Sequence, residues 1–314
     1  MHYTKPYLDI DEQILLLESR GMDIGDRALS VRALSQIGYY RLSAYWYPFR
    51  EIQNNIRTDQ FRDGAKLHDA VALYVFDKKL RLHILDAIER IEIALRTSIT
   101  LKMGRFGPLA HRDAAYVHGN FNRSRRPGGR TKFQDWMTRL DKCEERSRDE
   151  FVTHFRSKYT SERFLPIWIS VEVWELGLLS HFLAGMRHAD AQAIGQEFGV
   201  VDVRVLPSWT RALTFVRNVC AHHGRLWNRA MVDQPRFPRR GQIPEMDHVL
   251  ASRTSQEKLY GVCTILAYLT KQLNAGTNWH LRTKELLQTF PNSDLFSTSS
   301  AGFPRNWAQE ALWN

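Results

Sequence analysis

The chain has 314 residues, and its 44 Lys and Arg exceed its 34 Asp and Glu, which gives a formal net charge of +10 and a pI near 9.6. With 43% hydrophobic residues, including 16 Phe, 11 Tyr and 9 Trp, it can bury a substantial core as one large domain or two small ones. The positive excess favours a polyanionic partner, nucleic acid first and an anionic membrane surface second.

Secretion and membrane insertion are both disfavoured by the sequence. The first twenty residues mix polar and charged groups with apolar ones, unlike a signal peptide. The most apolar stretch, residues 164–184, contains Glu172, Glu175 and His181, so we expect a buried helix there and no membrane span. Three widely separated cysteines cannot all pair within one chain. We therefore expect a reduced, cytoplasmic protein without a membrane partner.

Helical spacing of apolar residues dominates the chain and predicts an all-α fold. The predicted helices cover residues 9–20, 28–36, 67–103, 133–158, 165–186, 189–198, 208–223 and 255–273. Strand signals are scarce, and Gly or Pro separates most of the helices. We expect a single domain over residues 1–285, with a basic loop inserted near 104–132, and a C-terminal tail over 286–314.

Two early segments permit more than one interpretation. The aromatic block at 39–50, with Arg41 and Arg50 interleaved, fits a buried aromatic cluster or a surface on which bases stack. In the long helix 67–103, Glu89 and Glu92 lie off the apolar stripe. Such acids usually form ion pairs, although they could act together with a histidine.

Residues 121–132 carry five cations and no acid. The cations are Arg123, Arg125, Arg126, Arg130 and Lys132. Pro127-Gly128-Gly129 excludes regular structure, so we predict a flexible basic loop. It would either follow a phosphate backbone, with salt-dependent affinity, or remain a solvated surface loop.

The segment 217–229 is the densest cluster of functional side chains in the chain. It holds Arg217, Asn218, His222, His223, Arg225, Asn228 and Arg229. Guanidinium groups bind phosphate, and an imidazole exchanges protons near neutral pH. We predict a helix that begins at Ser208 as N-cap and stops at Gly224. Asn218 and His222, four residues apart, would share a face. Arg217 would lie about 140° from His222 around the helix.

Segment 217–229 also permits other interpretations. An Arg-x4-His spacing also fits a helix end whose cations bind the last carbonyls. No C-x-x-C pair or second Cys/His cluster accompanies Cys220, so we expect no metal. The phosphate-loop pattern G-x4-G-K and the nucleophile pattern G-x-S-x-G are missing, so we expect no cofactor and no serine hydrolase.

The residue pattern of segment 217–229 resembles that of the Abi family of abortive-infection proteins, the AbiD/AbiF-like group. This group belongs to the HEPN superfamily of small helical domains, many of them metal-independent ribonucleases. The resemblance continues through residues 5–14, 37–50, 73–77, 88–96, 151–155 and 165–173. Residues 104–132 and those after about 285 match nothing in the pattern.

The resemblance implies a HEPN-type helical bundle that cleaves RNA in anti-phage defence. His222 would act as base on the ribose 2′-OH or as acid on the leaving 5′-oxygen, and Arg217 would stabilise the scissile phosphate. Asn218 would orient His222 or hold the phosphate. The products would carry 2′,3′-cyclic phosphate and 5′-OH ends, and DNA would not be cut.

The resemblance also bears on the other residues of segment 217–229 and on the oligomeric state. His223, Arg225, Asn228 and Arg229 would contact RNA or fix the turn after Gly224, and Trp227 would belong to the core. HEPN ribonucleases commonly dimerise so that two Arg–His sets face one groove, which implies a homodimer. The alternative is a non-catalytic RNA-binding or phage-sensing HEPN protein, bound to a small noncoding RNA.

Overall fold

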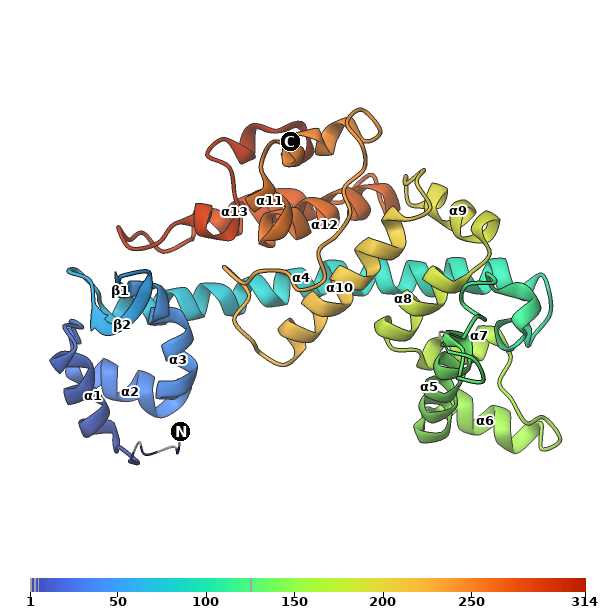
Figure 1. Cartoon of the computed structure of the whole chain (residues 1–314), viewed down its shortest axis with the longest axis horizontal. Helices are drawn as coiled ribbons and strands as arrows, with labels where there is room; N and C mark the ends of the chain where they lie inside the picture. Colours follow the sequence, from blue (N-terminus) through green and yellow to red (C-terminus); the bar gives the residue numbers. More distant parts are fainter. Residues whose placement is uncertain (1, 3, 5, 125) are drawn as a thin grey trace.

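The long helix α4 (Leu67–Gly104) is the central element of the molecule, and the other helices pack along it (Figure 1). The structure is a computed structural model that describes residues 2, 4, 6–124 and 126–314. The buried apolar stripe of α4 consists of Leu80, Ile84, Ile88, Ile91 and Leu95. The all-α prediction is confirmed: the described chain is mostly helical.

One end of α4 carries the N-terminal elements. These are α1 (Ile10–Ser19), α2 (Arg27–Ile37), α3 (Tyr39–Trp46), β1 (Arg50–Gln53) and β2 (Ile56–Phe61). The two strands form an antiparallel hairpin that the spacing of apolar residues did not predict. Its turn residues Asn54 and Asn55 adopt positive φ angles of 49° and 63°, which Asn tolerates better than most residues.

The other end of α4 carries the segments from the middle of the chain (Figure 1). They are α5 (Lys132–Arg146), α6 (Glu150–Lys158), α7 (Ile167–Ser170), α8 (Leu176–Gly185) and α9 (His188–Glu197). The predicted single helices 133–158 and 165–186 are therefore wrong, because each is interrupted.

Side-chain hydrogen bonds explain both interruptions. The Ser147 hydroxyl donates to Asp149 Oδ2 (2.6 Å) and accepts from the Asp149 backbone N–H (3.3 Å), a local alternative to helical bonding. At the second break the Trp174 carbonyl accepts from Arg96 Nη2 (2.9 Å) on α4. A carbonyl satisfied by a neighbouring helix has no need of its own helical partner.

The last part of the chain returns to α4. It contains α10 (Val205–Ala221), α11 (Arg253–Glu257), α12 (Leu259–Leu273) and α13 (Trp279–Gln288). α10 packs against α4 and α8, and α12 packs against α4. Residues 286–314 add Phe296, Phe303 and Trp313 to the same hydrophobic core. The division into a domain of 1–285 and a tail stays a prediction.

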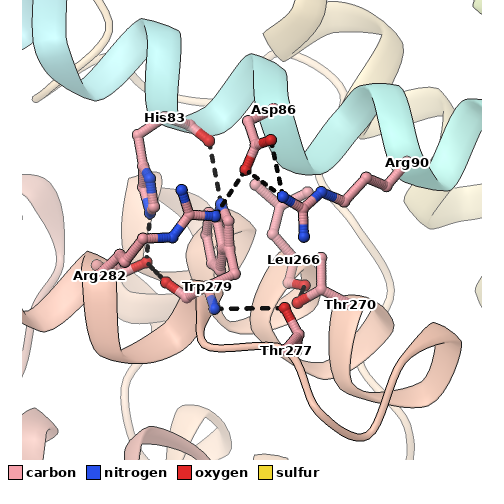
Figure 2. A network of polar contacts seen from close by, with 9 residues as sticks. His83, Asp86, Arg90, Leu266, Thr270, Thr277, Trp279 and Arg282 are labelled. Atoms are coloured by element: carbon pink, nitrogen blue, oxygen red, sulfur yellow. Dashed lines mark hydrogen bonds and ion pairs between the residues drawn. The ribbon is translucent and has the colours of Figure 1, made fainter.

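Polar contacts join α13 to α4 (Figure 2). The His83 ring stacks on Trp279 with centroids 4.5 Å apart, and its Nε2 lies 2.7 Å from Thr283 Oγ1. Trp279 Nε1 donates to the His83 carbonyl (3.0 Å), and Arg282 Nη2 donates to Asp86 Oδ2 (2.9 Å). α13 is thus held both by apolar burial and by directional bonds.

Among the described helices, none combines the length and the apolar character that a bilayer crossing requires.

Candidate functional site at the end of α10

The C-terminal end of α10 closes with a tight turn. His222 is the capping residue, and His223 adopts the left-handed conformation (φ 56°). The His223 N–H donates to the Cys220 carbonyl (3.0 Å) and the Gly224 N–H to the Val219 carbonyl (2.8 Å). These two bonds are those of a Schellman turn. The predicted stop at Gly224 is corrected, because His223 takes the position that glycine usually occupies.

The start of α10 also differs from the prediction. The helix begins at Val205, and Ser208 lies in its first turns, buried. The Ser208 hydroxyl accepts from the Arg236 backbone N–H (2.8 Å), so it anchors a later loop instead of capping the helix. Asp202 ends the preceding turn, where its carboxylate accepts from the Arg204 N–H (2.9 Å).

The exposed face at the end of α10 presents Asn218 and His222, as their spacing predicts. Arg217 is half-buried, and its Nη1 donates to Asn218 Oδ1 (3.3 Å). This bond turns the guanidinium toward the face of Asn218, which reduces the angular separation expected from an ideal helix. Arg217 is thus bound to Asn218, which lies four residues before His222 on the exposed face.

Arg217 also borders a groove of about 400 Å³ between α10 and α4. Glu89, Glu92, Arg96 and Ile93 line the same groove. Burial raises the pKa of Glu92, whereas Arg96, whose Nη2 lies 2.6 Å from its carboxylate, and Arg217 act in the opposite direction. Glu92 is thus an ion-pair partner whose carboxylate also attracts Arg217.

A buried polar cluster on α4 and α3 holds the chain that follows α10; we call it the Asp77 clamp and define it as Asp77, Arg81 and Tyr45. The Asp77 carboxylate is fully buried and accepts from Arg81 Nη1 (2.6 Å) and from the Tyr45 hydroxyl (2.8 Å). It also accepts from the backbone N–H groups of Leu226 (3.0 Å) and Trp227 (2.8 Å). Burial raises the pKa of Asp77, and these donors oppose that effect by binding the ionised form.

Arg81 of the clamp and one further cation, Arg41, bind carbonyls of the same turn. Arg81 Nη1 donates to the Gly224 carbonyl (3.3 Å), and Arg41 Nη1 donates to the His223 carbonyl (2.9 Å). The turn that carries His222 is therefore fastened to both α3 and α4. Sequence reasoning missed these positioning residues. The available signal was an Asp77-x3-Arg81 pair at helical spacing from the apolar positions Leu80, Ile84 and Ile88.

The other residues of segment 217–229 differ in burial and in what they contact. Half-buried Arg225 donates to the Ala44 carbonyl at the end of α3, and burial lowers its pKa. It thus fixes the turn, one of its two predicted roles. The exposed Arg229 places its guanidinium 5.6 Å from the ring centre of Phe215 on α10. His223 is exposed, Asn228 is half-buried, and Trp227 is fully buried in the core, as predicted.

The aromatic block at 39–50 is largely core. Tyr45, Trp46 and Phe49 are buried, which confirms the cluster interpretation for these rings. Tyr40 stands apart with 91% of its surface exposed.

The predicted basic loop lies beside the start of α5, away from the end of α10. Arg123 and Arg126 are exposed, whereas the Arg130 Nε donates to Asp135 Oδ1 (2.7 Å); Arg125 lies outside the described residues. The cavity at the loop has no lining residue in common with the groove at Arg217. The structure therefore does not bring the two predicted phosphate-binding regions into one pocket.

Comparison with known families agrees with the resemblance in the sequence. A family model described as Abi-like protein matches residues 32–228, more than half of the chain. The chain belongs to the Abi-like protein family. The match includes α4, the Asp77 clamp and segment 217–228, and membership of the family indicates a role in abortive infection. No curated protein and no solved structure matches this Abi-like protein.

Proposed function

We propose that this Abi-like protein is a metal-independent HEPN endoribonuclease that acts in abortive-infection defence. The observation that carries the proposal is the exposed end of α10, where His222 and Asn218 share a face and Asn218 binds Arg217. An imidazole, an amide and a guanidinium at one solvent-accessible edge are suited to phosphodiester chemistry.

The reaction follows from these groups. His222 removes the proton of the ribose 2′-OH, and the 2′-oxygen attacks the adjacent phosphorus. The bond from phosphorus to the 5′-oxygen breaks, and the leaving oxygen takes up a proton, which leaves a 2′,3′-cyclic phosphate and a 5′-OH. Arg217 stabilises the negative charge that grows on the phosphate oxygens, and Asn218 holds the phosphate or the imidazole.

The Asp77 clamp contributes by fixing the turn before any substrate arrives. Asp77 binds the backbone at Leu226 and Trp227, and Arg81 binds the carbonyl of Gly224. A turn held in this way keeps His222 at the helix end without a cost of ordering during the reaction.

A homodimer would supply the second proton carrier that one His222 lacks. In a two-fold dimer with the ends of α10 near the axis, two sets of Arg217 and His222 would face one RNA groove. Ile93, which lines the groove next to Arg217, is 54% exposed and offers an apolar contact for such a partner.

One observation favours a second candidate, an RNA-binding protein without cleavage. Within the described part of the chain, no hydrogen bond joins Arg217 directly to His222, and Arg217 shares its groove with Glu89 and Glu92. Such an Arg217 could serve RNA binding or regulation alone.

The reaction products decide between the two candidates. Purified protein is incubated with labelled single-stranded RNA and with DNA of the same sequence, with and without excess EDTA. We expect RNA cleavage that survives EDTA, products with 2′,3′-cyclic phosphate ends, and intact DNA. Cleavage that is abolished by EDTA and restored by Mg²⁺ or Mn²⁺ would contradict the proposal. Tight RNA binding without cleavage would favour the second candidate.

A further inference from the structure

A second hollow, separate from the groove at Arg217, lies between α5, α8 and α10. It has a volume of about 470 Å³. Lys132 and Arg139 of α5, His181 of α8 and Arg211 of α10 contribute to its wall. We call it the Arg139 pocket. Its size is in the range of pockets that hold small ligands.

The pocket concentrates positive charge that the protein leaves uncompensated. Among the residues that the structure describes, no carboxylate lies within ion-pair distance of Lys132 or Arg139. The pocket's own acid, Asp135, is bound by Arg130 (2.7 Å). Arg211 has a loose contact with Asp233 at 3.8 Å. The cations are therefore available to an anion.

His181 adds a hydrogen-bond donor of defined orientation. Arg139 Nη1 lies 3.2 Å from His181 Nδ1, and because a guanidinium only donates, Nδ1 accepts this bond. Burial, Arg139 and Arg211 lower the pKa of His181, which favours the neutral ring. Its proton is then on Nε2, which is left to donate to a ligand.

The apolar side of the pocket is rigid. Trp136 is buried, with its Nε1 bonded to the Leu178 carbonyl (3.1 Å), and Phe121 packs directly over Gly185, where a Cβ would overlap its ring. The His118 N–H donates to the Gly185 carbonyl (2.7 Å), which joins this wall to α8. The hollow is thus formed before a ligand binds.

We propose that the Arg139 pocket binds a phosphate group of a nucleotide. Arg139 and Arg211 provide guanidinium groups, which bind phosphate in a bidentate manner, and Lys132 provides a third positive charge. The apolar wall of Phe121 and Trp136 gives the attached nucleoside a surface to contact.

The phosphate can come from a free nucleotide or from an RNA strand. Arg211 precedes Asn218 by seven and His222 by eleven residues, so the three share one face of α10. Along the helix axis Arg211 lies about 16 Å from His222. An RNA strand along this face would place one phosphate at His222 and another phosphate of the same strand in the pocket. That RNA is the source of the phosphate rests on the proposed function.

Titration calorimetry with the full chain tests the pocket. The protein carries His222→Ala so that RNA stays intact, and the probes are inorganic phosphate, ADP and a single-stranded RNA of ten nucleotides. We compare it with the same protein carrying Lys132→Gln and Arg139→Gln, both at exposed positions. The matched control is Arg32→Gln, an exposed cation on α2 at the opposite end of the molecule. Circular dichroism confirms that each variant is folded.

We expect the pocket variant to bind at least one phosphate-bearing probe tenfold more weakly or worse, with the control unchanged. Loss of ADP binding identifies a free nucleotide as the source. Loss confined to RNA identifies the strand. Equal affinity of the pocket variant and the control for all three probes, including no binding at all, overturns the proposal. Such a result leaves the cleavage assay, and with it the proposed function, unaffected.

Discussion

His222 ends α10 with its side chain in solvent, and His223 then takes a left-handed conformation that costs a non-glycine residue about 1 kcal/mol. The surrounding bonds offset this cost: Arg41 binds the His223 carbonyl and Arg81 the Gly224 carbonyl. The strained turn next to the candidate base is held by exposed Arg41 on α3 and by buried Arg81 on α4, and this support fits the role proposed for the turn.

At the scale of single residues, the Asp77 clamp gives a testable prediction. Asp77→Asn removes the charge that compensates buried Arg81 and weakens the bonds to Leu226 and Trp227. Because an unpaired buried charge is left behind, we expect the free energy of unfolding, measured with urea, to fall by about 3–5 kcal/mol.

Asp77→Asn combined with Arg81→Met serves as the control, since it removes both charges. This double variant should be more stable than Asp77→Asn alone. A loss below about 1 kcal/mol for Asp77→Asn would show that the clamp does not hold the turn.

At the scale of elements, apolar periodicity located α1, α2, α4 and α9 to within a few residues. Periodicity reports which face is buried, and in these helices nothing competes with it. It failed where side chains bind the backbone, as at Ser147 and Trp174, and where α3 is too short and aromatic to show a clear period.

In the candidate site, too, local features were predictable from the sequence and long-range contacts were not. The shared face of Asn218 and His222 is a local property of α10 and was predictable from spacing. The Asp77–Arg81 pair is local, but its contact with the turn joins residues about 150 positions apart, so no local pattern reveals what the clamp holds. The position of the basic loop relative to α10 depends likewise on tertiary packing.

The junction of α13 with α4 gives a prediction on pH. Burial, with a smaller effect of Arg282, lowers the pKa of His83 to about 4. Between pH 6.5 and 4 the unfolded chain therefore binds a proton that the folded chain excludes, and stability falls as the pH falls. We expect the free energy of unfolding to drop by about 2 kcal/mol more between pH 7 and pH 5 in the wild type than in His83→Gln.

His154→Gln is the matched control for this measurement, because His154 is exposed on α6. It should leave the pH dependence of the wild type unchanged. Identical pH profiles for the wild type and His83→Gln would contradict the assignment of a half-buried His83 with a lowered pKa.

At the scale of the whole molecule, α10 connects the two candidate phosphate sites. Its middle contributes Arg211 to the Arg139 pocket, and its end carries Asn218 and His222. One straight helix keeps their separation constant, which suits a substrate that extends along it.

The proposed dimer would double this arrangement. If its composite site takes the base from one chain and Arg217 from the other, mixed His222→Ala and Arg217→Ala chains should regain part of the activity.

The initial rate of RNA cleavage in excess EDTA tests the central claim most directly. We predict that His222→Ala and Arg217→Ala each lower this rate by roughly 10²–10⁴-fold, because each removes a group that acts in the transition state. Their thermal unfolding should stay close to that of the wild type, and His154→Ala, an exposed histidine on α6, should cut at the wild-type rate. Wild-type rates for both His222→Ala and Arg217→Ala would contradict the account and place the active site away from the end of α10.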